Sequence, residues 1–141
     1  MFGMTNRQFL KRSKKALEET GVQILALRGL MNQEANAHIS ITEAIRRLDM
    51  LRKDVENTFS TYEKLEPPSE CFNLHQEMLN GLILFFESIV SYLEYLHSIE
   101  DNSQEEYRDL LGKSNENLQK YQELSLKLSR EVDSNLSKKI K

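Results

Sequence analysis

The sequence contains few of the residues that interrupt, cross-link or stiffen a chain. It has one cysteine, two prolines and five glycines in 141 residues. The single cysteine excludes an internal disulfide framework, and the scarcity of proline and glycine favours long helices over a turn-rich sheet protein. The net charge is only −3, so no general excess of positive charge indicates nucleic-acid binding.

Targeting signals and catalytic motifs are also missing. The acidic pair Glu18-Glu19 precedes the first apolar run, and that run, residues 22–31, contains Arg28 and is followed by no small-residue cleavage site. The chain has neither a glycine-rich phosphate loop nor a G-x-S-x-G turn. We therefore expect a cytoplasmic protein that is not an enzyme and binds no cofactor.

Start and stop signals divide the chain into four segments. Capping boxes, in which Ser or Thr is followed three residues later by Glu or Gln, begin at Thr5, Ser40 and Ser103. The pair Pro67-Pro68 interrupts any helix that precedes it. We predict helices over residues 6–32, 41–65, 69–99 and 104–135, with 32–39 as a loop or a distorted continuation.

Four long helices with short connections predict the architecture. Sequential helices joined in this way pack as antiparallel neighbours. We therefore predict one all-α domain over residues 1–141, an up-down-up-down four-helix bundle. The alternative is an elongated three-helix arrangement that dimerises through the third helix.

The third predicted helix is the most apolar part of the chain, and its side chains follow the heptad spacing of coiled coils. Its heptad and flanking positions hold Phe72, His75, Met78, Leu79, Leu82, Ile83, Phe85, Phe86, Ile89, Val90, Tyr92, Leu93, Leu96 and Ile99. Polar residues, Ser88 among them, occupy the remaining face. The apolar arc covers roughly half the circumference, which is wider than the stripe of a surface helix. We therefore expect this helix to contact at least two neighbours.

Apolar residues that extend beyond this arc predict an interaction surface. Leu84 and Tyr95 interrupt the polar face, and together with Ile83 and Val90 they would form a patch large enough for self-association. We predict a binding or scaffolding module that acts through helix-face contacts with a protein partner. A second copy is the first candidate partner, which would make a homo-oligomer such as a dimer. The weakly apolar seam of the fourth helix could serve instead, and an internal apolar pocket would use the same residues.

The first helix suggests a second hypothesis. Five basic residues lie within its first three turns: Arg7, Lys11, Arg12, Lys14 and Lys15. A basic amphipathic helix can lie on an anionic membrane surface or contact an acidic partner. A solvated helix face accounts for the same residues, so membrane association is the alternative and not the main prediction.

A metal-binding bundle is the third hypothesis. Glu94 and His97 have the E-x-x-H spacing of di-iron carboxylate bundles, which need two such motifs and two further glutamates. Cys71 and His75 would supply two zinc ligands, which do not make a site. We expect no metal site and predict that His75 bonds a neighbouring backbone carbonyl.

The link between the second and third predicted helices resembles a known pattern. The run Tyr62-Glu63-Lys64-Leu65-Glu66-Pro67-Pro68-Ser69-Glu70, followed by His75 and Met78-Leu79, is similar to uncharacterised small helical-bundle proteins and lipoproteins of Gram-positive bacteria. The resemblance covers about a quarter of the chain and implies a helical bundle of bacterial origin. This chain departs from the lipoprotein members because we expect neither a signal peptide nor a lipidation cysteine in it, and no site residue is implied.

Overall fold

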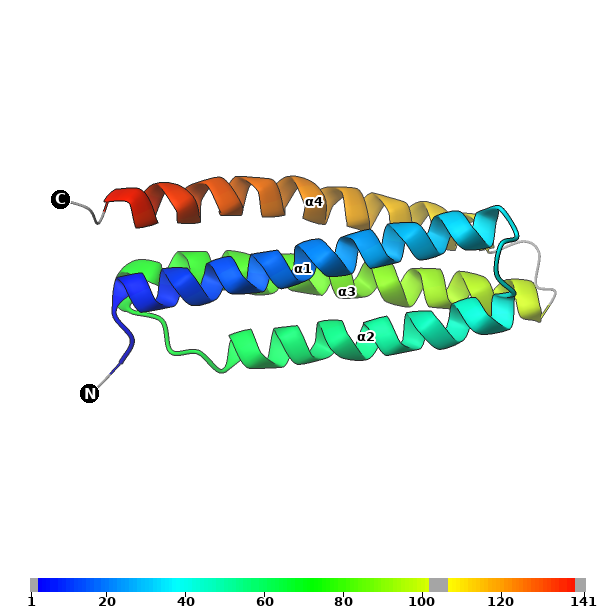
Figure 1. Ribbon diagram of the computed structural model, residues 1–141, viewed down its shortest axis with the longest axis horizontal. Coiled ribbons are helices and arrows are strands. Elements are labelled where there is room, and N and C mark those ends of the chain that lie inside the picture. Colours follow the sequence, from blue (N-terminus) through cyan, green and yellow to red (C-terminus); the bar gives the residue numbers. More distant parts are fainter. Residues whose placement is uncertain (1–2, 102–106, 139–141) are drawn as a thin grey trace.

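The computed structural model describes residues 3–101 and 107–138. These residues form α1 (Asn6–Ala35), α2 (Ile41–Glu63), the short 3₁₀ helix η1 (Ser69–Cys71), α3 (Phe72–Glu100) and α4 (Tyr107–Ser137), with no β-strand among them. Successive helices lie side by side and run in opposite directions (Figure 1). The predicted all-α, antiparallel four-helix bundle is therefore confirmed.

The four helices form a closed ring around one core. Each helix packs along the two helices next to it, α4 closes the ring against α1, and the closest packing is between α3 and α4. The helices α2 and α4 lie on opposite sides of the bundle (Figure 1). As predicted, α3 packs along two neighbours, and it leaves one face outside the ring.

The N-terminal caps follow the sequence signals in part. The Thr5 hydroxyl accepts a hydrogen bond from the Gln8 amide at 3.1 Å, and the Gln8 side chain accepts one from the Thr5 amide at 2.9 Å. At the second box, Ser40 caps Glu43, but the Glu43 carboxylate pairs with Arg46 and Arg47 instead of returning to the Ser40 amide. Only half of that predicted box forms. The third box, Ser103 with Glu106, lies outside the described residues.

The helix α1 continues to Ala35, past its predicted end at residue 32. It ends in a Schellman motif, in which His38 N–H bonds the Gln33 carbonyl at 2.8 Å and Ala37 N–H bonds the Glu34 carbonyl at 3.0 Å. Ala37 adopts a φ of 57°, in the left-handed region that normally favours glycine. The prediction was wrong here because no glycine marked the end.

The other boundaries shift by short distances. The helix α2 ends at Glu63, before the predicted residue 65, and residues 69–71 form a 3₁₀ helix before α3 begins. The helix α4 extends to Ser137, past residue 135, and its predicted start at residues 104–106 lies outside the described part of the chain. These differences leave the bundle topology unchanged.

The core confirms most of the predicted face of α3 and corrects it at three positions, one of which is Ile83, 43% exposed although it was placed at a flank of the apolar arc. Six apolar residues of α3 are almost fully buried: Met78, Leu82, Phe85, Ile89, Tyr92 and Leu96. Phe72, predicted to lie in the seam, is 55% exposed, whereas Ser88, assigned to the polar face, is completely buried. The buried face is therefore rotated toward α4, because Gly81 and Ser88 allow that helix to approach closely.

Candidate functional site

An apolar strip remains on the outer face of α3. It consists of Phe72, Leu79, Ile83, Phe86 and Val90, which we call the α3 stripe. Phe72 is 55% exposed and Ile83 is 43% exposed, whereas Leu79, Phe86 and Val90 are partly buried. At 1.5 Å per residue the stripe is roughly 27 Å long. Such contiguous apolar surface is typical of an interaction site.

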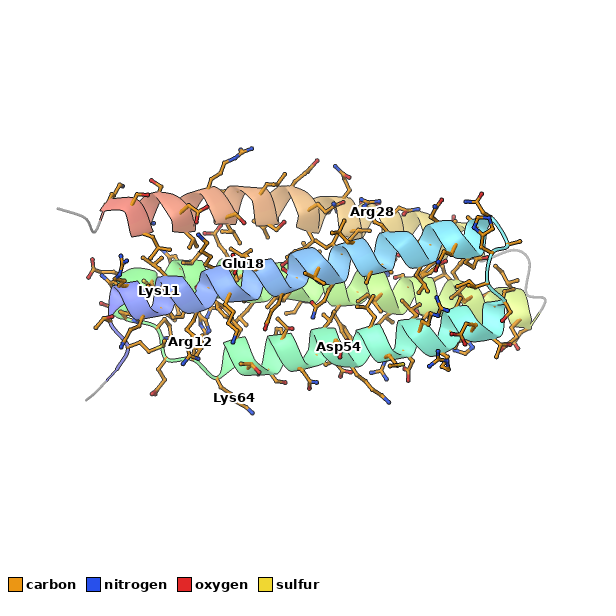
Figure 2. All side chains as sticks on the ribbon, in the orientation of Figure 1. Lys11, Arg12, Glu18, Arg28, Asp54 and Lys64 are labelled. Carbon is orange, nitrogen blue, oxygen red and sulfur yellow. The ribbon has the colours of Figure 1, made fainter. Side chains whose placement is uncertain are left out.

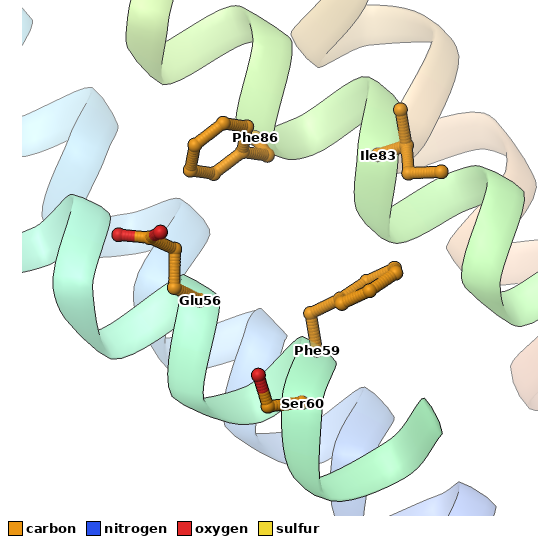
Figure 3. A pocket seen from close by; sticks show the side chains of 5 residues that line it. All are labelled: Glu56, Phe59, Ser60, Ile83 and Phe86. Atoms are coloured by element: carbon orange, nitrogen blue, oxygen red, sulfur yellow. The ribbon is translucent and has the colours of Figure 1, made fainter. Parts of the chain in front are cut away.

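A groove lies beside the stripe, between α2 and α3. It has a volume of about 230 Å³ and is lined by Glu56, Phe59, Ser60, Ile83 and Phe86. Figure 3 shows side chains from both helices facing one another across it, with the Phe59 ring directed toward α3. An apolar side chain from another molecule would therefore contact aromatic and aliphatic walls, with Glu56 and Ser60 at the rim.

The four predicted partner-binding residues do not share one surface. Ile83 and Val90 belong to the α3 stripe, whereas Leu84 and Tyr95 pack against the core. The Tyr95 ring stacks on Tyr92 with ring centroids 5.7 Å apart. Sequence reasoning grouped the four by their position outside the heptad seam. It missed Phe72 and Phe86 as surface-forming residues because it assigned both to the buried arc, and it did not single out Phe59. The width of the apolar arc of α3 could have revealed an exposed apolar surface, because the arc is wider than two neighbouring helices cover.

The five predicted basic residues are all exposed, but they point in several directions. Lys14 forms an ion pair with Asp133 of α4 at 3.1 Å, and Arg7 donates to the Leu136 carbonyl at 3.5 Å. Arg12 and Lys15 line a small hollow on the α2 side. Figure 2 shows Lys11 and Arg12 near the beginning of α1. Part of the basic cluster is therefore committed to contacts within the bundle.

The interior contains polar groups that are paired with one another. Three tyrosines, one each from α2, α3 and α4, bond to residues of α1: Tyr62 to Ser13 at 2.7 Å, Tyr92 to Glu34 at 2.9 Å and Tyr121 to Thr20 at 2.9 Å. Burial raises the pKa of Tyr121 to about 12 and raises the pKa of Tyr62 and of Tyr92 well above their ordinary value. These phenols stay protonated. Tyr92 and Tyr121 donate to α1, whereas in the Tyr62–Ser13 bond either hydroxyl can be the donor, and all three bonds help to fix the helix register.

His75 belongs to this interior. Its Nε2 donates to the Tyr62 carbonyl at 3.0 Å. Its ring packs against the rings of both Phe9 and Tyr62, with centroids 5.6 and 5.0 Å away, and these two rings also contact each other. This is the backbone-carbonyl bond predicted from the sequence. Cys71, near the same end of the bundle, is buried, and its Sγ donates to Asn6 Oδ1 at 3.7 Å.

The candidate metal ligands are not brought together. Across residues 3–101 and 107–138 no group of three or more His, Cys, Asp or Glu side chains could hold a metal ion. Glu94 is exposed, and His97 Nδ1 lies 3.8 Å from Glu100. The E-x-x-H spacing is therefore not joined by further ligands from the described residues.

The segment Ser69–Glu100 is the one described helical segment that is long and apolar enough to cross a membrane. The core helix of a water-soluble protein has the same length and composition. In the bundle, Glu87 and Glu94 of this segment are exposed, and Glu77 lies 3.4 Å from Lys127.

Comparison with protein-family models, curated proteins and solved structures gives no match for this chain.

Proposed function

We propose that this chain is a non-catalytic, cytoplasmic helical-bundle module that binds protein through the α3 stripe, and that its first partner is a second copy of itself. The observation that carries the proposal is the exposure of Phe72 and Ile83 on one helix face beside an apolar groove. Such faces bind other helices by packing apolar side chains into the groove. The same face on a second copy offers a stripe of matching length and character.

The exposed surface is large enough to matter energetically. A phenylalanine side chain that is 55% exposed leaves roughly 100 Å² to be buried, which is worth about 2–3 kcal/mol. Ile83 adds about 1 kcal/mol at 43% exposure. Because a symmetric dimer counts each residue twice, these two positions supply about 7 kcal/mol against the cost of association. This supports a reversible dimer.

The substitution Ile83→Asp tests the proposal. Two copies of the change remove about 2 kcal/mol of apolar burial and place two carboxylates in the interface, for a total of about 4 kcal/mol. The dissociation constant should rise by about a thousandfold. Sedimentation velocity and light scattering across the micromolar range would show a dimer for the wild type and a monomer for the variant.

A matched control keeps the test specific. Leu25 is 72% exposed on α1, away from the α3 stripe, so Leu25→Asp should leave the dimer intact. Circular dichroism would verify that both variants remain helical. A wild-type chain that is strictly monomeric over this range would contradict the proposal, as would equal weakening by both substitutions.

Membrane association is the competing proposal, and the exposure of Lys11, Arg12 and Lys15 on α1 supports it. Co-sedimentation with vesicles of anionic lipid would detect such binding, which should weaken with salt. Changing these three residues to glutamine should abolish it. Binding that survives both salt and substitution would not fit an electrostatic surface contact.

A further inference from the structure

Four of the five members of the α3 stripe are spaced symmetrically about one position of the helix; the exception is Phe86, whose counterpart is the exposed Gln76. Phe72 and Val90 lie equally far along the chain from Gly81, on opposite sides, and so do Leu79 and Ile83. If two α3 helices run antiparallel with their Gly81 residues at the same level, Phe72 of one helix therefore faces Val90 of the other. In the same way, Leu79 of one helix faces Ile83 of the other. A symmetric dimer requires this kind of self-complementarity.

Resting on the proposed self-association, we infer that two copies pair their α3 helices antiparallel, about a two-fold axis at the level of Gly81. Phe72 of one copy then packs on Val90 of the other, and Leu79 packs on Ile83 at the mouth of the α2–α3 groove (Figure 3). Gly81 itself faces α4. The two-fold axis therefore lies on the side of α3 that faces away from α4.

The charges beside the stripe favour the antiparallel arrangement. Residues Asn73, Gln76, Asn80, Glu87 and Glu94 are exposed along one flank. In the antiparallel register Glu87 faces the amides of Gln76 and Asn73 of the second copy, and Glu94 extends past the start of its α3. A parallel two-fold pairing would place the two copies of this flank on opposite sides of the contact. The glutamates of one copy would then face the apolar groove side of the other, where no amide would meet Glu87.

Single cysteines on this flank distinguish the registers. Asn80 lies almost at the axis, so Asn80→Cys in two copies would lie close together. The two cysteines of a Glu94→Cys dimer would be separated by roughly 40 Å along the helices, at 1.5 Å per residue. In a parallel two-fold dimer the two copies of either residue would lie at the same level but on opposite sides of the contact, out of reach of a short cross-linker. Cys71 is buried, so the wild-type chain serves as the blank.

The experiment treats each full-length variant with a short bis-maleimide cross-linker at a concentration where sedimentation shows the dimer. We expect covalent dimer from Asn80→Cys, and none from Glu94→Cys or the wild type. Covalent dimer from Glu94→Cys would overturn the proposed register, and none from either variant, with the dimer still present, would overturn the antiparallel pairing of this face. A chain that sediments as a monomer throughout would overturn the proposed self-association itself.

Discussion

Replacing Gly81 with alanine tests how closely α3 and α4 pack. A β-carbon at this position would lie 2.9 Å from Cδ2 of Leu124 and 3.1 Å from Cε1 of Tyr121. The Leu124 methyl can move, because it ends a flexible side chain. The Tyr121 ring cannot move easily, since it stacks on Phe85 with centroids 5.2 Å apart and its hydroxyl is bonded to Thr20.

Two effects of opposite sign determine the result. Alanine in place of glycine stabilises a helix interior by about 1 kcal/mol, whereas forcing an extra carbon into a packed core costs about 1–3 kcal/mol. The nearest contacts are below normal van der Waals separation, so the cost prevails. We expect Gly81→Ala to lower the free energy of unfolding by up to about 2 kcal/mol.

Gly29→Ala is the matched control, because a β-carbon at Gly29 would meet nothing within 4 Å. It should raise the free energy of unfolding by about 1 kcal/mol. Urea denaturation followed by circular dichroism measures both variants at one protein concentration, which a dimer requires. If Gly81→Ala stabilises the protein as much as Gly29→Ala does, the close approach of α4 to α3 is wrong.

Three further substitutions test local features. Ala37→Gly should raise the free energy of unfolding by about 1 kcal/mol, because it relieves the left-handed φ of 57°; no gain in urea denaturation would argue against that cap. Ser88→Ala should cost about 1 kcal/mol by removing a buried 2.7 Å bond to α4. The control Ser98→Ala, at a half-buried serine whose hydroxyl bonds only the Glu94 carbonyl of its own helix, should be close to neutral in the same assay. Hydrogen bonds from Arg46 and Arg47 lower the pKa of Glu43 to about 2 from 4.5, so the stabilisation from Glu43 is present above pH 4.5 and lost as the pH falls toward 2. Glu43→Gln should therefore flatten the acid limb of stability measured against pH, and an unchanged limb would show that the pairs contribute nothing.

Local signals in the sequence predicted the elements of the fold well. The capping box at Thr5 formed as predicted because it involves only neighbouring backbone and side-chain groups. Ser40 capped its helix too, but Glu43 had better partners in Arg46 and Arg47. A capping motif therefore locates a helix start more reliably than it assigns both of its hydrogen bonds.

The candidate site was less predictable. Periodicity showed that α3 has more apolar surface than one neighbour covers, but not which residues would stay outside. Phe72 and Ser88 exchanged their expected environments because α4 packs against the Gly81 side of α3. That choice depends on side chains from another helix, which the pattern of a single helix does not contain.

The sequence by itself determined the number of helices, their antiparallel order and the broad apolar face of α3, because caps, prolines and heptad spacing act within a few residues. Tertiary structure alone decided which part of that face is covered, which tyrosines bond to α1, and that Phe72 and Ile83 remain at the surface. These features arise where helices distant in sequence meet, and the shapes of both partners set how closely they approach.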